Sequence, residues 1–463
     1  MGSPSSVRGE PKIAAPAGEM EISITAAQVI RPRYPTPSHL RNFEFSLLDR
    51  QNAPWLYSNF LLIYAANTSS LSIAEKVRSL KESLSDTLVL YYPLAGKIKD
   101  IATVECNDDG AAFIEARVDT PLSYFLRKPT ADFLHRLMPF NDANTMREFA
   151  NFTLLIQVTV FHCGGLALAS CPSHRLMDAS SMCTFLRTWA KLTTSPCNNS
   201  IRNTVTPPHF LGPSIIPAIK DLPDRPFVHY HPDYEKFSSR RFIFSGSNLM
   251  SLKEKCGSTD SLGHKRPTRV EVVQALIVKC AIRATSLLHP GPSFVFQTLN
   301  LRNRINPPVG ADAVGNLIWT PSLLFEEGEM ELNQILATLR RGLKTFCDKK
   351  SGRFNPKEGF GVVSEELKEK QELLGRAGPN FYGFSSLCRF PFYEIDFGWS
   401  RPAWITNVPI FENMCFMVDS RTGDGIEAWM TMEKEVMASL ESDEEFLAYA
   451  SIDTPVDIGH SRL

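Results

Sequence analysis

Two apolar runs joined by a short glycine-containing segment form the most distinct pattern along the chain. Residues 152–161 and 166–170 have the length and apolar content of strands, and the connecting His-Cys-Gly-Gly suits the turn of a β-hairpin. Residues 180–192 then place apolar side chains on one face at helical spacing. The pattern predicts strand, strand and helix, with residues 171–179 at the open end of the hairpin.

The rest of the first half also mixes strands and helices. Alternating or apolar runs predict strands at residues 21–30 and 59–66, and spaced apolar positions predict a helix at 72–85. The turn sequence Cys-Asn-Asp-Asp-Gly at residues 106–110 predicts a pair of strands around it. Residues 1–20 carry no apolar run, so we expect a disordered tail there.

The second half begins with a proline-rich stretch without a period, residues 198–235, which predicts a linker between domains. Helices are predicted at 247–255, 270–288, 329–343 and 433–450. Strands are predicted at 241–245, 293–301, 383–388, 393–397, 413–418 and 426–432. Since strands and helices intermix throughout, the fold class is α/β or α+β.

Composition narrows the class of protein. A chain of 463 residues exceeds a single core, which favours two domains. The net charge of −1 argues against a nucleic-acid surface and against docking on anionic membranes. No apolar run is long enough to span a membrane, and the ten cysteines are scattered without paired spacing. We therefore expect free thiols, a cytoplasmic location and a monomer.

Candidate chemistry begins with His174 and Asp178 at the open end of the hairpin. An imidazole has a reference pKa of about 6.5, so a histidine aimed at open space can act as a general base near neutral pH. A carboxylate four residues later can hold the local backbone. The same spacing recurs at His229 and Asp233, but that copy lies in the proline-rich stretch and is interpreted as linker.

Further polar residues end other strands. Arg302 follows a predicted strand, and a fixed guanidinium can hold a carboxylate by two parallel hydrogen bonds, with Asp178 and Asp396 as the candidate partners. A solvated charge is the simpler alternative. In the segment Asp396-Phe-Gly-Trp-Ser, Gly398 permits a turn, and Trp399 is either a core aromatic or an indole donor for a developing oxyanion.

A basic segment precedes the helix predicted at 270–288. Thr268 with Glu271 fits a capping box, which is the simpler role. Lys265, Arg266 and Arg269 also surround this helix N-terminus, so the segment is a candidate site for the phosphates of a nucleotide-like ligand.

The common catalytic signatures are absent: the sequence holds no GxSxG, HExxH, Walker A or Rossmann glycine motif. His229 and His231 have no third ligand nearby, so no metal site is predicted.

Taken in order, these motifs resemble the plant BAHD acyltransferases. The resemblance rests on His174 with Asp178, on Asp396-Phe-Gly-Trp, and on the segments Tyr-Tyr-Pro-Leu-Ala-Gly-Lys, Asn-Leu-Arg-Asn-Arg and Asp-Ser-Arg-Thr-Gly-Asp-Gly-Ile-Glu-Ala-Trp. It runs from about residue 21 to 450, and it is strongest toward the vinorine synthase-like branch that acetylates alkaloids and terpenoids. One departure is Ser400, where the family motif ends in glycine.

The resemblance implies two similar-sized chloramphenicol-acetyltransferase-like α/β domains with mixed sheets, joined by a crossover loop, with the active-site channel at their interface. The resemblance also implies a tail at 1–20, a first domain at 21–202 with 393–414, a linker at 203–236, and a second domain at 237–392 with 415–463. Asp178 is then structural and bonds to Arg302 and Asn316, and Asp396 lies near Arg302.

The function that the resemblance implies is transfer of an acyl group, with acetyl favoured, from acyl-coenzyme A to a hydroxyl of a plant metabolite. His174 is the expected base, acyl-coenzyme A is a co-substrate, and no bound cofactor is expected. Two alternatives remain open: a coenzyme A-independent hydrolase or lyase that uses the same histidine, and a catalytically silent binding relative.

Overall fold

The fold was analysed in a computed structural model of the chain. The structure describes residues 21–66, 70–140, 149, 151–194, 205–218, 235–257, 266–326, 328, 330–378, 380–409 and 411–456.

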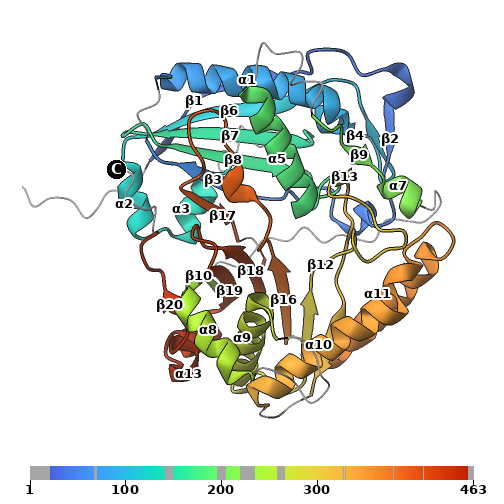
Figure 1. The fold of residues 1–463 in the computed structure, drawn as a ribbon, viewed down its shortest axis with the longest axis vertical. Coiled ribbons are helices and arrows are strands. Elements are labelled where there is room, and N and C mark those ends of the chain that lie inside the picture. Colours follow the sequence, from blue (N-terminus) through green and yellow to red (C-terminus); the bar gives the residue numbers. More distant parts are fainter. Residues whose placement is uncertain are drawn as a thin grey trace, which may run out of the picture.

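The described chain forms two bodies, each built on a large mixed β-sheet (Figure 1). The first sheet has the order β1-β6-β7-β8-β3-β17, in which only β6 and β7 run parallel. Its strands are β1 (Ile22–Ile30), β3 (Phe60–Tyr64), β6 (Ala111–Val118), β7 (Leu154–Phe161), β8 (Leu166–Pro172) and β17 (Trp404–Asn407). The predicted hairpin is confirmed, because β7 and β8 pair antiparallel.

Two long helices, α1 (Ile73–Leu90) and α5 (Ala179–Thr193), cover one face of this sheet (Figure 1). The helix α1 begins at a capping box formed by Ser72 and Glu75. The short helices α2 (Leu122–Arg127) and α3 (Ala131–Arg136) contribute to the apolar cluster on the other face.

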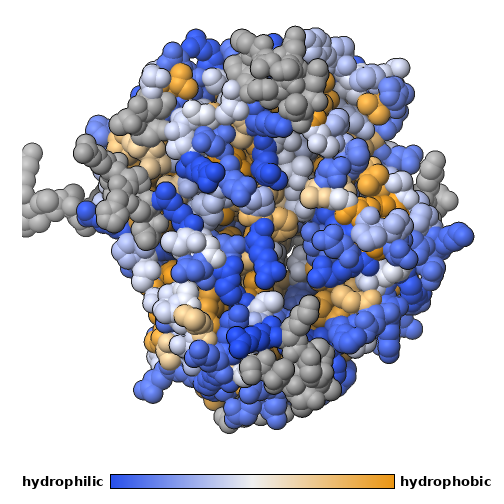
Figure 2. All heavy atoms as spheres, viewed as in Figure 1, coloured by the Kyte–Doolittle hydropathy of each residue, from blue (hydrophilic) through white to orange (hydrophobic). Residues whose placement is uncertain are grey.

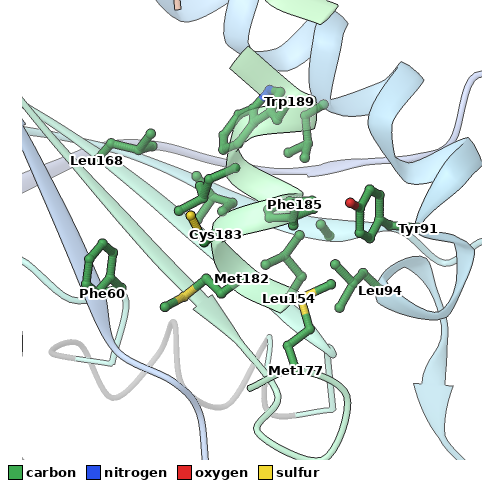
Figure 3. Packing of buried hydrophobic residues seen from close by; sticks show 14 of the residues in the cluster. Phe60, Tyr91, Leu94, Leu154, Leu168, Met177, Met182, Cys183, Phe185 and Trp189 are labelled. Carbon is green, nitrogen blue, oxygen red and sulfur yellow. The ribbon is translucent and has the colours of Figure 1, made fainter. Parts of the chain in front are cut away.

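The first core lies between α5, α1 and the sheet. Figure 3 shows Phe185 of α5 beside Tyr91, with Trp189 further along the same helix. The Tyr91 and Phe185 rings are 5.2 Å apart in an edge-on arrangement, and the Trp189 indole N–H donates to the carbonyl of Leu80 at 3.1 Å. These contacts hold α5 against α1. They thereby also position the N-terminus of α5, next to His174 and Asp178.

The second sheet has the order β15-β11-β16-β18-β19-β10-β20, and β16 runs parallel to both of its neighbours. Its strands are β10 (Phe237–Phe244), β11 (Ser293–Gln297), β15 (Ser322–Phe325), β16 (Phe381–Ser386), β18 (Met414–Asp419), β19 (Ile426–Glu433) and β20 (Ser451–Ile452). Helices α8 (Gly246–Lys255), α9 (Arg269–Ser286), α10 (Leu332–Lys349), α11 (Gly359–Ala377), α12 (Lys434–Glu441) and α13 (Glu444–Leu447) pack on this body.

The remaining short elements are β2 (Asn42–Glu44), β4 (Lys97–Ile98), β5 (Thr103–Glu105), β9 (His209–Phe210), α7 (Gly212–Ile215), β12 (Leu299–Asn300), β13 (Ala313–Val314) and β14 (Ile318–Trp319). These short strands form three small sheets, in which β2 and β4 pair with β5, β12 pairs with β14, and β9 pairs with β13. The 3-10 turns are η1 (Ser38–Leu40), η2 (Asp49–Gln51), η3 (Tyr92–Ala95), η4 (Ser351–Arg353) and η5 (Phe392–Glu394). No helix within the described ranges is long and apolar enough to cross a membrane.

One strand crosses between the bodies. Although β17 lies between β16 and β18 in the sequence, it pairs with β3 in the first sheet. The indole N–H of Trp404 in β17 donates to Glu427 at 3.0 Å, and that of Trp429 donates to Thr406 of β17 at 2.8 Å. These bonds join the edge of the first sheet to β19 of the second. The predicted class of two mixed-sheet α/β bodies is therefore confirmed.

Three local predictions are wrong. The strands around residues 106–110 do not pair with each other, because β5 pairs with β2 and β4 while β6 pairs with β1 and β7. The strand predicted at 393–397 begins as the 3-10 turn η5, and the carbonyl of Ile395 accepts from the Tyr64 hydroxyl at 3.1 Å. The last helix breaks into α12 and α13, because Asp443 caps a new helix by accepting from the N–H of Phe446.

Candidate active site

His174 lies two residues after the end of β8, at the end of the hairpin. Its backbone N–H donates to the carbonyl of Leu56 at 2.8 Å, and the preceding Ser173 donates its N–H to Thr153 at 2.8 Å. These bonds fix the chain where it leaves the sheet. The imidazole is half-buried and lines a cavity between the two bodies.

Asp178 is the N-cap of α5, and it is turned into the protein. Its Oδ1 accepts from the backbone N–H of Ser181 at 2.9 Å, which satisfies one of the unpaired amides of the first helical turn. Both carboxylate oxygens also accept from Arg302, with Nη1 at 2.7 Å and Nη2 at 3.0 Å. Asp178 and Arg302 are only 1% and 2% exposed, so this is a buried bidentate pair.

Arg302 joins the start of α5 to the segment that follows β12. Its Nε and Nη2 donate to the carbonyl of Ala313, and Nη2 also donates to the carbonyl of Gly315 at 3.2 Å. Of the two partners considered for this guanidinium, the structure selects Asp178. Within the described residues, the carboxylate of Asp396 instead accepts from the N–H of Gly398 at 2.8 Å and forms no ion pair with Arg302.

Asn316 contacts the catalytic candidate itself. Its Oδ1 lies 3.1 Å from Nδ1 of His174, and its Nδ2 donates to the backbone carbonyl of His174 at 2.6 Å and to Asp49 Oδ1 at 3.0 Å. The resemblance implied a bond from Asp178 to Asn316. The structure differs here, because Asp178 accepts from the backbone N–H of the next residue, Leu317, at 3.1 Å.

These bonds determine which nitrogen of the His174 ring carries the proton. The Nδ2 of Asn316 faces two acceptors, so its amide is oriented with Oδ1 toward the ring. An amide oxygen can only accept, and Nδ1 of His174 therefore holds the proton. The lone pair is left on Nε2, which suits a base facing the cavity.

The surroundings of the His174 ring also change its pKa. Burial lowers the pKa of His174 below its usual value, while the ring's own backbone carbonyl, Asp178, Asn316 and Asp49 act in the opposite direction. Burial also raises the pKa of Asp49, which is 1% exposed and accepts from Ser46 and Asn316. The imidazole is thus neutral at neutral pH and ready to accept a proton.

The cavity at His174 has a volume of about 420 Å³ and is lined from both bodies. The surface is hollowed between the two halves of the molecule in Figure 2. The apolar wall is mostly aromatic and comprises Leu56, Phe296, Ile318, Phe381, Phe390, Phe411, Met414 and Phe416. The polar lining includes Asn52, Ser180, Thr298, Asn300, Thr320, Ser385, Ser386 and Glu412.

The second motif lies apart from this cavity. The ring of Trp399 stacks on Phe397 at 5.6 Å and packs against Tyr64 at 6.3 Å, and it is not part of the cavity lining. The structure therefore does not bring the indole together with His174. Gly398 has a φ of +96°, so it is the position that requires glycine, whereas Ser400 is not among the described residues with positive φ.

Part of the basic segment before α9 forms contacts within the protein, so those residues are less available to a ligand. Thr268 and Glu271 form the predicted capping box at the start of α9. Arg269 bonds to Asp419 at 2.9 Å and so supports the turn after β18. Arg266 is exposed, and Lys265 lies outside the described residues, as do His229, His231 and Asp233.

Asp49 is the site residue that the sequence did not reveal. It is 267 positions from Asn316, and its local signal is a single acid in an apolar segment. Ser385 and Ser386 were also missed, although a pair of serines at the end of an apolar strand is a recognisable pattern.

Comparison with known proteins agrees with this architecture. A family model described as the Transferase family matches residues 20–447. A limonoid 1-O-acetyltransferase of Citrus sinensis is 33% identical over 445 residues, covering 94% of this chain and 99% of the relative. The crystal structure of vinorine synthase matches with a TM-score of 0.80 at 26% identity, covering 95% of this chain and all of its own.

A more distant structure shares the fold. F. graminearum TRI101, complexed with coenzyme A and T-2 mycotoxin, matches with a TM-score of 0.67 at 17% identity, covering 89% of this chain and 99% of its own.

The described chain thus forms two mixed-sheet bodies around a shared cavity with a histidine in its wall. The chain belongs to the BAHD acyltransferase family, and it is an acyl-coenzyme A-dependent O-acyltransferase of plant specialised metabolism.

Proposed function

We propose that the protein transfers an acetyl group from acetyl-coenzyme A to a hydroxyl of a polycyclic terpenoid or alkaloid, with His174 as the general base. One observation carries this proposal: the Nδ1 of His174 is held by Asn316, and the ring lines a cavity between the two bodies. Among the described residues, none bonds to Nε2, which leaves that nitrogen for a substrate.

In the proposed reaction, Nε2 of His174 removes the proton of the acceptor hydroxyl while the oxygen attacks the thioester carbonyl carbon. A carbon–oxygen bond forms, and the carbonyl oxygen becomes the oxyanion of a tetrahedral intermediate. As this intermediate collapses, the carbon–sulfur bond breaks and the proton on Nε2 passes to the departing thiolate. The products are an ester and free coenzyme A, and the ring is neutral again.

Asp178, Arg302 and Asn316 support the proposed reaction by holding other groups in place. The Asp178–Arg302 pair holds the start of α5 and the segment around residue 315, so we assign both residues a structural role. Asn316 orients the base. Donors that line the same cavity, on Thr298, Asn300 and Ser385, are better placed than Trp399 to stabilise the oxyanion.

The size and the apolar lining of the cavity support the proposed class of acceptor. A volume of about 420 Å³ with an aromatic lining suits an apolar, drug-sized ligand. The limonoid acetyltransferase that the chain resembles acts on a polycyclic terpenoid, which favours the same class here. Acetyl as the acyl group rests on that same similarity.

The remaining assignments are also proposals. Arg266 and the start of α9 are candidate contacts of the coenzyme phosphates, with Lys265 beside them in the sequence. The domain boundaries are proposed as stated above. Nine cysteines in the described chain are free, which favours a reducing, cytoplasmic location. A monomer remains part of the proposal.

The test is a thiol-release assay with acetyl-, malonyl- and aroyl-coenzyme A against a panel of hydroxylated terpenoids and alkaloids, with and without the acceptor. We expect acceptor-dependent release that is fastest with acetyl-coenzyme A. Thioester loss that is independent of the acceptor would identify a hydrolase. Coenzyme A binding without release for any acceptor would identify a silent relative.

A further inference from the structure

Gly383 lies at the centre of the cavity-facing side of the second sheet. It pairs with Phe296 of β11 on one side and with Met414 of β18 on the other. Phe381 and Ser385, two positions before and after it on β16, both line the cavity. Because side chains alternate along a strand, Gly383 faces the cavity as well.

The space above Gly383 is filled by the side chains of its two neighbours. A Cβ atom at this position would lie 1.9 Å from Sδ of Met414 and 2.4 Å from Cζ of Phe296. Both of these side chains line the cavity, and they lean toward each other across the glycine. Gly383 is not among the glycines with positive φ, so space rather than backbone conformation calls for glycine here.

A side chain at position 383 would displace the side chains of Phe296 and Met414. The Phe296 ring lies against Phe294 at 5.8 Å and under the ammonium group of Lys370 at 6.0 Å, and the backbone of the sheet lies beneath. Because both side chains line the open cavity, the flexible end of Met414 and the edge of the Phe296 ring yield most readily into that space. Any displaced atom reduces the volume of about 420 Å³ that is open to an acceptor.

We propose that Gly383 is a specificity-determining residue: it lets Phe296 and Met414 lie flat across β16 and so sets the depth of the acceptor part of the cavity. This inference rests on the proposed function, since it concerns the acceptor of that same reaction. It fits a bulky polycyclic acceptor, because only a large ligand would fill the cavity as far as Phe296 and Met414.

The test compares acceptors of different size in the Gly383→Ala variant. The panel runs from limonoid alcohols to benzyl alcohol with acetyl-coenzyme A, and the comparison uses the bulkiest and the smallest alcohols that the wild-type protein acetylates. One added methyl group in a pocket changes discrimination by about 10–200-fold, so kcat/KM for the bulkiest acceptor should fall in that range. The value for the smallest acceptor should stay within about twofold, because its complex does not reach the floor.

Two further variants separate this effect from a folding defect. Gly375→Ala is the matched control, since Gly375 lies on the surface of α11 with no atom within 4 Å of the added Cβ, and its size preference should match the wild type. The double variant Gly383→Ala, Met414→Ala removes the side chain that collides most closely. The edge of the Phe296 ring must still yield, so activity with the bulky acceptor should recover in part.

Three outcomes overturn the inference. Equal loss for large and small acceptors in Gly383→Ala, with no recovery in the double variant, contradicts the role in specificity. An unchanged size preference contradicts it as well. Transfer by the wild-type protein to no alcohol of the panel overturns the proposed function, and the inference with it.

Discussion

Asn316 accepts a hydrogen bond from the Nδ1 of His174 across 3.1 Å, although the two residues are 142 positions apart. Asn316 is 1% exposed and is itself oriented by Asp49, so the bond is part of a buried chain of contacts that ends at the ring of the proposed base. Asn316 therefore fixes the tautomer of the His174 ring, whereas Asp178 holds the backbone at the start of α5.

The first prediction concerns this orientation. Asn316→Leu keeps the volume but removes the acceptor for Nδ1–H, so the ring loses its fixed orientation. We expect kcat to fall by about 10–100-fold, with KM for the acceptor nearly unchanged. Steady-state kinetics with a good acceptor measures both constants. An unchanged kcat would show that the ring is oriented without Asn316.

The pH dependence of activity provides a second prediction. Burial lowers the pKa of His174 below about 6.5, and the base must be neutral to act. The value of kcat/KM should therefore rise with pH below 6.5 and be level through neutral pH. Since the bond to Asn316 raises this pKa, the acidic limb of Asn316→Leu should move to lower pH. A limb centred above pH 7 in the wild-type protein would contradict this environment.

The buried pair of Asp178 and Arg302 should contribute to stability. Asp178→Ala leaves a buried guanidinium without its carboxylate, which costs about 3–5 kcal/mol of unfolding free energy. The double variant Asp178→Leu, Arg302→Met should recover part of this loss, because neither buried charge is left alone. Urea unfolding measures both values.

A matched surface pair provides the control for this experiment. Arg376 and Glu326 form an ion pair at 2.7 Å with side chains 57% and 71% exposed, so Glu326→Ala should change stability by less than about 1 kcal/mol. If Asp178→Ala and Glu326→Ala lowered the unfolding free energy equally, the buried pair would have no special structural role.

Acid stability should depend on Glu445. Burial raises its pKa, but Lys279, Lys255 and Arg283 together outweigh this and lower the pKa to about 2. A lowered carboxyl pKa stabilises the fold above about pH 4.5, and this contribution is lost as the pH falls from 4.5 toward 2. After allowance for solvent screening, Glu445→Gln should cost about 1–2 kcal/mol at pH 7 and less at pH 3. Thermal unfolding at the two pH values tests this difference.

Local patterns predicted the parts of the fold that local forces decide. The β7–β8 hairpin and the capping box of α9 were predictable because each depends on residues that are close in the sequence. The turn at 106–110 also has a strong local signal, yet Gly110 there bonds to the carbonyl of Ala95 and the following strand joins β1 and β7. Competition from distant strands decides such pairings, and no local pattern records it.

The site shows the same division. His174 was predictable because it lies just beyond an apolar strand, and Asp178 and Asp396 were the candidate partners of Arg302 from the sequence. The choice of Asp178 over Asp396, and the contact of Asp49 with Asn316, depend on how the two bodies meet. The segment from Tyr393 to Phe397 alternates like a strand, but it turns to carry the chain into the first sheet.

The central claim is that His174 exchanges a proton with both substrates in the cavity. The most direct measurement is the turnover of His174→Ala with acetyl-coenzyme A and the best acceptor of the panel, with thermal unfolding measured on the same sample. We expect kcat to fall by a factor of about 10²–10⁴, with an unchanged unfolding midpoint. Full turnover by a folded His174→Ala variant would contradict the claim.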